Sequence, residues 1–380
     1  MKHDLPLSGA VAFGFEAVRD EFTALFTDEL ERGAGLAVYI DGAPVVDLVA
    51  GWADKACEVT FTDQHLVPVY SCSKAISGLV IAWVAAQGKL SYEQKVCELW
   101  PEFAANGKDQ VTIGQVLSHQ AGLCGIEAPW TPQDWFDWQK TTTRLAEMKP
   151  LWELGDGSGY HSVTWGYLAG EIVLRATGGR SIGTILREEF CALNQLDFWI
   201  GLPDEEHERV AEISKPTRIP SGFSTPNEFQ KLAFMRAWSS PGRRGGAEWR
   251  RMELPSANGH GTARAMAQLM GMLANNGKLE TREMLTPSVL AQAISERVAG
   301  KDRVLPYNMS FGAGLIRNTP ARHVYGPGNH TVGHTGFGGS VTFADTEKNI
   351  SFGYVTTKQD NQLVKDVRAG RLIAAVYECL

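Results

Sequence analysis

Apolar positions near the N-terminus first repeat with a helical period and then form two short runs. The repeating positions are Val18, Phe22, Leu25, Phe26 and Leu30. Their helical spacing predicts an amphipathic helix over residues 14–32 that ends at the Gly33-Ala34-Gly35 stretch. Residues 36–40 and 44–51 lie on either side of a short Asp-Gly-Ala turn, which predicts two strands of an antiparallel sheet.

The pattern becomes helical again after Ser71. The apolar stripe consists of Ile76, Leu79, Val80, Trp83 and Val84. A helix that ends near Gly88 is expected, followed by a helix-rich stretch to about residue 276. The clearest helices within it are predicted at 113–119, 163–177 and 262–273. Residues 203–258 lack periodicity and contain Pro216, Pro220, Pro226, Pro241 and a Gly-Arg-Arg-Gly-Gly run, so we expect a long functional loop there.

Strand-like runs return at the C-terminal end, at 311–316, 340–344 and 350–356, before a closing helix at 363–380. The expected fold class is therefore α/β (α+β). Residues 1–70 and 277–380 would form an α/β lobe with an antiparallel sheet. Residues 71–276 would form a mostly helical lobe that includes the irregular loop 203–258.

Composition narrows the choice of partners. The chain has 380 residues and a net charge of −7, which disfavours nucleic acid or an anionic membrane surface as the main partner. The doublets Arg243-Arg244 and Arg250-Arg251 are interpreted as solvated loop charges. No apolar run is long enough to span a membrane, and residues 1–16 lack a signal-like apolar run. The six cysteines are scattered and form no C-x-x-C pair. In a long chain without a secretion signal, reduced thiols are expected, and the absence of signals predicts a cytoplasmic location.

Ser71-Cys72-Ser73-Lys74 is the first candidate for chemistry. Ser71 lies where a strand-rich segment gives way to a helix, so its hydroxyl would sit at a helix N-terminus that favours developing negative charge. A spacing of three places Lys74 within hydrogen-bonding reach, and a buried neutral lysine can act as a base. The alternative is that Ser71 only caps the helix and Lys74 is a surface charge.

Two later elements carry further candidates. Tyr160, in Tyr160-His161-Ser162, follows a glycine-rich approach, so its phenol could point into a cleft and relay a proton, or could simply be a packed tyrosine. His334-Thr335-Gly336-Phe337 precedes a strand. The N–H of Phe337 could join that of Ser71 in an oxyanion hole, or the segment could be only a glycine-rich turn with His334 at the surface.

Together, the three elements and their order resemble the serine β-lactamase and penicillin-binding superfamily, whose motifs are S-x-x-K, Y-x-N or Y-x-S, and K-T-G or H-T-G. A tyrosine in the second motif is typical of the class C branch. Residues 116–123, 150–160, 258–264 and 333–344 are similar to further family segments, the last of them to the final catalytic strand. The resemblance implies a β-lactamase-like fold, with an antiparallel sheet flanked by helices and a mostly helical lobe.

Two departures from this family bear on the substrate. His334 stands where β-lactamases of this type usually carry a lysine that grips a carboxylate, and Ser162 stands in place of an asparagine. Both features resemble the family VIII carboxylesterases. The resemblance implies a serine hydrolase that cleaves small esters with short to medium acyl chains, with Ser71, Lys74 and Tyr160 as catalytic residues. His334, Gly336, Phe337, Ser162 and the Ser71 N–H would contact the substrate.

Other activities remain as alternatives: a weak β-lactamase, a D-amino-acid peptidase, an acyltransferase, or a catalytically silent binding protein. No cofactor or metal is expected, because the chain has no H-E-x-x-H motif, and the absence of G-x-S-x-G disfavours an α/β-hydrolase. A cluster of aromatic residues follows Pro129 and either packs in the core or lines an acyl pocket; its members are Trp130, Trp135, Phe136 and Trp138.

Overall fold

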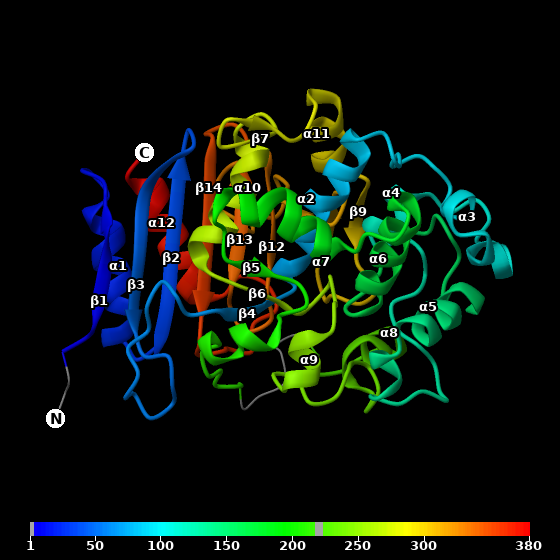
Figure 1. Cartoon of the computed structure of the whole chain (residues 1–380), viewed down its shortest axis with the longest axis horizontal. Helices are drawn as coiled ribbons and strands as arrows, with labels where there is room; N and C mark the ends of the chain where they lie inside the picture. The colour runs from blue at the N-terminus through cyan, green and yellow to red at the C-terminus, as the bar shows by residue number, and fades with distance from the viewer. Residues whose placement is uncertain (1–3, 217–222) are drawn as a thin grey trace.

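A nine-stranded antiparallel sheet joins the two ends of the chain (Figure 1). The computed structural model describes residues 4–216 and 223–380. Strand β2 (Gly33–Ile40) pairs with β14 (Ile350–Thr356), so residues more than 300 positions apart lie side by side. The order across the sheet is β1 (Leu7–Val11), β3 (Ala43–Gly51), β2, β14, β13 (Val341–Asp345), β12 (Thr331–Thr335), β11 (Ile316–Arg317), β10 (Asn308–Phe311) and β9 (Val298–Lys301).

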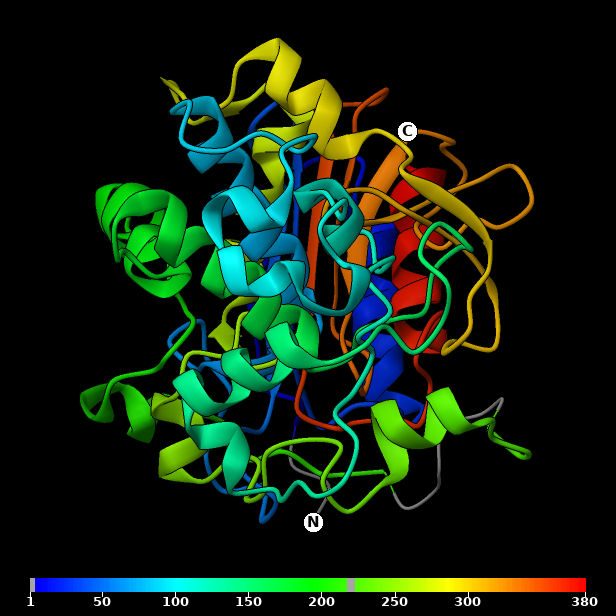
Figure 2. The same cartoon turned by 90° about the vertical axis from the view of Figure 1, so that its right-hand side faces the viewer.

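Helices cover both faces of this sheet, as the two views show (Figures 1 and 2). Helices α1 (Glu16–Thr27) and α12 (Val367–Glu378) pack together on one face. Helix α10 (Ala263–Ala274) covers β2, β13 and β14 on the other face, beside α2 (Cys72–Ala86). The central strands are therefore covered on both sides, which explains why every residue of β13 and β14 is buried.

The remaining helices extend from α2 away from the sheet. They are α3 (Val96–Leu99), α4 (Ile113–Leu117), α5 (Trp138–Glu147), α6 (Thr164–Thr177), α7 (Ile182–Ile185), α8 (Glu228–Gln230), α9 (Ala247–Arg251) and α11 (Pro287–Ile294). A small sheet of β4 (Val67–Tyr70), β6 (Gly259–Gly261) and β5 (Phe198–Trp199) leads into α2, and β7 (Lys278–Leu279) pairs with β8 (Arg282–Glu283). Within the described residues, no helix has both the length and the apolar character needed to cross a membrane.

The predicted first helix, 14–32, is too long. Helix α1 ends at Thr27, and Glu29 adopts a left-handed backbone conformation (φ 57°) that ends the helical path. Gly33 belongs to β2 and does not end the helix. A Cβ at Gly33 would lie 2.1 Å from the Trp52 carbonyl oxygen, so glycine is needed for close pairing with β3, not for capping.

Three other predicted elements have different boundaries. The single strand 311–316 is wrong: β10 and β11 form two strands, because Gly314 (φ 76°) turns the chain between them. Helix α4 ends at Leu117, two residues before the end of the predicted 113–119. The closing helix begins at Val367, where the Asp366 carboxylate accepts hydrogen bonds from the first free N–H groups of α12.

The segment 333–344, interpreted as one final strand, is two strands joined by a turn at 336–340. Strands β1 and β9 of the large sheet were missed, whereas the helices predicted after Ser71, at 163–177 and at 262–273 are confirmed. The irregular loop 203–258 has only short helical turns in its described part, and residues 217–222 with Pro220 lie outside the described residues.

The division into two lobes stays a prediction. Helix α10, which the sequence analysis assigned to the helical lobe, packs on the sheet.

A buried ion-pair network ties α12 to the turn 336–340. The Arg368 guanidinium bonds to Glu31 at 2.9 Å and to Asp366 at 2.7 Å, and the side chains of all three are at most 4% exposed. Arg368 also donates to the Gly338 carbonyl at 2.7 Å. Removing one member of such a network leaves buried charges without partners, so the network is expected to hold the turn in place.

Replacing Arg368 tests whether the buried ion-pair network stabilises the fold. Arg368→Met should lower the free energy of unfolding by about 3–5 kcal/mol, because Glu31 and Asp366 then remain buried without a cation. Arg371→Met on the same helix removes a more exposed pair to Glu21 and should cost about 1 kcal/mol or less. Urea denaturation followed by circular dichroism measures both. Equal losses in the two variants would show that the buried network has no special role.

Candidate active site

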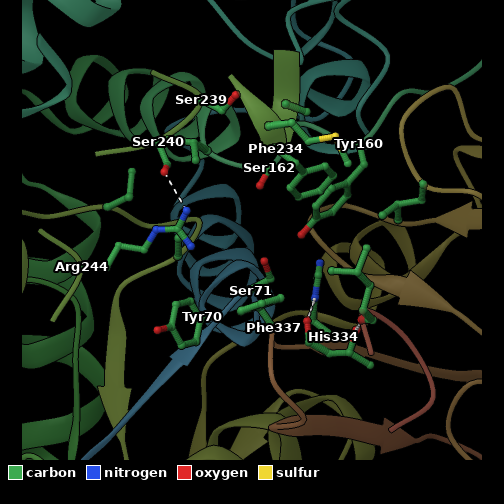
Figure 3. A pocket seen from close by; sticks show the side chains of 18 of the residues that line it. Tyr70, Ser71, Tyr160, Ser162, Phe234, Ser239, Ser240, Arg244, His334 and Phe337 are labelled. Carbon is green, nitrogen blue, oxygen red and sulfur yellow. Dashed lines mark hydrogen bonds between the residues drawn. The ribbon is translucent and has the colours of Figure 1, made fainter. Parts of the chain in front are cut away.

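Ser71 lies at the junction of β4 and α2, in the position expected from the sequence. It is the N-cap residue of α2, but its side chain caps no N–H, so the interpretation of Ser71 as a helix cap is wrong. The preceding residue, Tyr70, has φ 47°, a conformation that costs a non-glycine residue about 1–2 kcal/mol. This strained turn projects the Ser71 hydroxyl into a cavity (Figure 3).

Lys74 is fully buried, one helical turn after Ser71, so the alternative of a surface charge is also wrong. Its Nζ lies 3.4 Å from Ser71 Oγ, 2.8 Å from the Ser162 carbonyl oxygen and 2.9 Å from the Ser256 carbonyl oxygen. Burial holds the pKa of Lys74 well below its usual value, and only the Cys72 thiol acts in the opposite direction. Burial therefore favours the neutral amine over the ammonium.

A neutral amine has two N–H groups and one lone pair. The two carbonyls, of Ser162 and Ser256, accept the two N–H groups. The lone pair is then left for the third neighbour, Ser71, whose hydroxyl can donate its proton to Lys74 Nζ. A separation of 3.4 Å is long for a hydrogen bond, as is common in active sites without substrate. This geometry suits Lys74 as the base that activates Ser71.

Tyr160 brings its phenol to the same point from a loop before α6. Figure 3 shows its hydroxyl directed toward Ser71. Burial raises the pKa of Tyr160, and a hydrogen bond to Ser71 opposes the rise. The phenol is therefore protonated at neutral pH and suits a proton donor better than a resting phenolate. Lys74 Nζ lies over the Tyr160 ring, 4.8 Å from its centroid.

Two residues that the sequence analysis did not select hold Tyr160 in place. The buried Asp302 carboxylate accepts hydrogen bonds from the Tyr160 N–H at 3.0 Å and from Ser158 Oγ at 2.8 Å. The His119 ring packs on the Tyr160 ring with centroids 4.7 Å apart, and His119 Nδ1 accepts from the His161 N–H. Asp302 lies more than 140 positions away, and no local motif marks it.

His334 is buried beside Tyr160, not at the surface. Burial lowers the pKa of His334 to about 3, so the ring is neutral. Its Nδ1 lies 2.8 Å from the Thr335 carbonyl oxygen and must carry the proton. Nε2 therefore keeps a lone pair. It is buried without a hydrogen-bond partner among the described residues, and that edge of the ring faces the Tyr160 hydroxyl (Figure 3). An uncharged acceptor here cannot hold an anion as a lysine would.

The turn 336–340 brings the Phe337 backbone next to Ser71. A Cβ at Gly336 would lie 2.2 Å from the Val69 carbonyl oxygen, so only glycine allows this approach to β4. The N–H groups of Ser71 and Phe337 have no backbone acceptor in the described part of the chain. They are available to a substrate oxygen, although their role as an oxyanion hole stays a prediction. The Gly336 N–H itself donates to the Ser340 carbonyl.

These groups open into a cavity of about 500 Å³. Of the residues predicted to contact substrate, Ser71, Tyr160, Ser162, His334 and Phe337 line it. Gly336 lies outside the lining, and Lys74 lies beneath the cavity, against Ser71. Most of the other described lining residues are apolar. The irregular loop supplies eight of these apolar residues: Phe223, Ala233, Phe234, Met235, Pro241, Trp249, Leu254 and Ala257.

The aromatic cluster after Pro129 does not line this cavity, so the interpretation as an acyl pocket is wrong. Trp135 is buried, and it packs with Trp138 against Tyr167, with ring centroids 5.5 and 5.0 Å apart. The aromatic walls are supplied by Phe234, Trp249 and others from the irregular loop. No group of three or more His, Cys, Asp or Glu side chains in the described residues is arranged to hold a metal ion.

Comparisons with known proteins agree with this arrangement. A family model described as β-lactamase matches residues 22–376. The protein "Esterase/beta-lactamase LipL" from Mycobacterium tuberculosis is 33% identical over 387 residues, covering 97% of this chain and 88% of LipL. A penicillin-binding protein homologue from Caulobacter crescentus has a TM-score of 0.95 at 48% identity, covering 99% of this chain and 100% of that chain. A family VIII carboxylesterase has a TM-score of 0.88 at 36% identity, with the same coverage.

The neutral state of Lys74 predicts the pH dependence of the site. Lys74 can accept the Ser71 proton only when unprotonated, and burial lowers its pKa, so kcat/KM should be constant from neutral pH upward. It should fall tenfold per pH unit only on the acidic side, as Lys74 becomes protonated. A pH–rate profile with p-nitrophenyl acetate tests this. A rate that still rises between pH 9 and 10 would indicate an ordinary lysine.

Proposed function

This chain belongs to the β-lactamase family, and from that membership and its site we propose that it is a carboxylesterase acting through a Ser71 acyl-enzyme. The single observation that carries the proposal is the buried Lys74 amine, 3.4 Å from the Ser71 hydroxyl, at the base of an apolar cavity. The superfamily predicted from three short motifs is confirmed, as is its β-lactamase-like fold. The names of LipL and of the family VIII enzyme support ester substrates.

The His334 side of the cavity favours simple esters over penicillin-like substrates. His334 is uncharged, so it supplies no cation where a lysine would bind a carboxylate. Apolar side chains from the irregular loop surround Ser71 and suit a short to medium acyl chain. A small ester is therefore the partner that we propose, and the cytoplasmic location stays a prediction.

In the first half-reaction, Ser71 Oγ attacks the ester carbonyl carbon while its proton passes to the lone pair of Lys74. The N–H groups of Ser71 and Phe337 donate to the carbonyl oxygen, where negative charge collects. The bond from carbon to the alcohol oxygen then breaks, and the Tyr160 phenol gives its proton to the departing alkoxide. Tyr160 regains a proton from Lys74, which restores the neutral amine and leaves an acyl group on Ser71.

In the second half-reaction, a water molecule attacks the acyl carbon and loses its proton to the same Lys74–Tyr160 pair. The carboxylic acid leaves, and Ser71 recovers its hydroxyl proton. An alcohol in place of the water would give acyl transfer, which is why an acyltransferase remains an alternative. A weak β-lactamase is the other candidate with specific support, because the name of LipL includes that activity.

Substitution of Lys74 provides the main test of this mechanism. Ser71→Ala should abolish hydrolysis of p-nitrophenyl esters, and Lys74→Met should lower kcat by at least about 10²–10⁴-fold, because the base is lost. Lys108→Met is the matched control. Lys108 is also buried, and its ammonium donates to the Ala105 carbonyl at 2.7 Å, but it lies outside the cavity. Near-normal kcat in Lys74→Met would refute the role of Lys74.

Substrate panels separate the related activities. Rates are compared for p-nitrophenyl esters from C2 to C12, nitrocefin and a D-alanyl amide, each with Ser71→Ala as a blank. Faster turnover of the esters is expected. Faster turnover of nitrocefin or of the amide would favour the β-lactamase or the peptidase. If a fluorophosphonate fails to label Ser71, the protein is not a serine hydrolase.

A further inference from the structure

Among the described residues, the lining of the cavity above Ser71 carries one formal charge. Of the described residues that line it, Arg244 is the only Lys, Arg, Asp or Glu. Arg244 belongs to the irregular loop and is exposed, as the sequence analysis expected, but its side chain points into the cavity toward Ser71 (Figure 3). A guanidinium among apolar walls is expected to attract an anionic group of the substrate.

Several other cations of the same loop already pair with carboxylates. Lys231 and Arg236 pair with Glu228 at 2.6 and 2.9 Å, and Arg251 pairs with Asp204 at 2.8 Å. Arg244, by contrast, donates to the Ser240 hydroxyl at 2.8 Å and forms no ion pair with a carboxylate in the described part of the chain. Its charge is therefore available to a ligand, with Ser240 beside it as a second donor.

The position of Arg244 shows which part of a substrate it would meet. Figure 3 places Arg244 and Tyr70 on one side of Ser71, and Tyr160 and His334 on the other. In the proposed mechanism Tyr160 protonates the leaving alkoxide, so the alcohol part lies on the Tyr160 side. The acyl part then extends toward Arg244, past the Trp249 wall.

We propose that Arg244 binds a carboxylate at the far end of the acyl chain, so that the preferred substrates are monoesters of dicarboxylic acids. This inference rests on the proposed esterase function and names its substrate class. The guanidinium fork and the Ser240 hydroxyl can bind both carboxylate oxygens. The apolar walls between Ser71 and Arg244 contact the intervening methylene groups. The subsite lies across Ser71 from His334, which is neutral and cannot supply this charge.

The test compares charged and neutral esters of equal length. Ethyl monoesters of dicarboxylic acids with four to eight carbons are assayed in a pH-stat beside the same esters with a primary carboxamide in place of the carboxylate. The wild-type protein should prefer one length of the charged series. Arg244→Gln should lower kcat/KM for that ester about 10- to 100-fold and change the carboxamide ester less than twofold. Arg244→Lys should restore part of the loss.

Arg243→Gln is the matched control, because Arg243 is the exposed neighbour and does not line the cavity. It should leave both substrates unchanged. Equal losses for charged and neutral esters in Arg244→Gln, or no preference for any charged ester in the wild-type protein, would overturn the proposal. In either case, continued turnover of the neutral esters would still support the proposed esterase function. If no ester of either series and no p-nitrophenyl ester is cleaved, the esterase function itself fails.

Discussion

The burial of the Lys74 amine between two backbone carbonyls is the interaction on which the site depends. A lysine in water is protonated at neutral pH and cannot accept a proton from serine. Full burial disfavours the ammonium, and the carbonyls of Ser162 and Ser256 take up the two N–H groups of the neutral form. The lone pair is then directed to Ser71. The chemistry of Lys74 therefore depends on the fold, because both carbonyls come from segments distant from Lys74 in the sequence.

Close backbone approaches and local strain bring the other groups to the same place. Tyr70 adopts a left-handed conformation so that Ser71 can leave β4 and begin α2. Gly336 lets the end of β12 press against Val69, which carries the Phe337 N–H beside Ser71. Asp302 fixes the Tyr160 backbone from the far side. The strain at Tyr70 is offset by packing elsewhere, as is common where a backbone is held for function.

Much of this arrangement could be predicted from short motifs. Ser71, Lys74 and Tyr160 follow from residue type, spacing and the resemblance, and long apolar helices such as α2 and α6 follow from their periodicity. Backbone carbonyls such as that of Ser256 have no signal, because any residue can supply them. Turns at Glu29 and Gly314 were missed because one left-handed residue outweighs the apolar pattern around it. The sequence does not distinguish Arg244 from other loop charges, because its place in the cavity lining depends on the fold.

The charge on the Lys74 amine in the resting protein is the quantity that tests this account most directly. It can be measured by NMR of protein labelled with ¹³C and ¹⁵N in its lysines, with the Lys74 signal assigned by its loss in Lys74→Met. A Lys74 pKa well below 10.5 is expected, with the amine neutral at pH 8. A signal that titrates near 10.5, together with the other lysines, would contradict it.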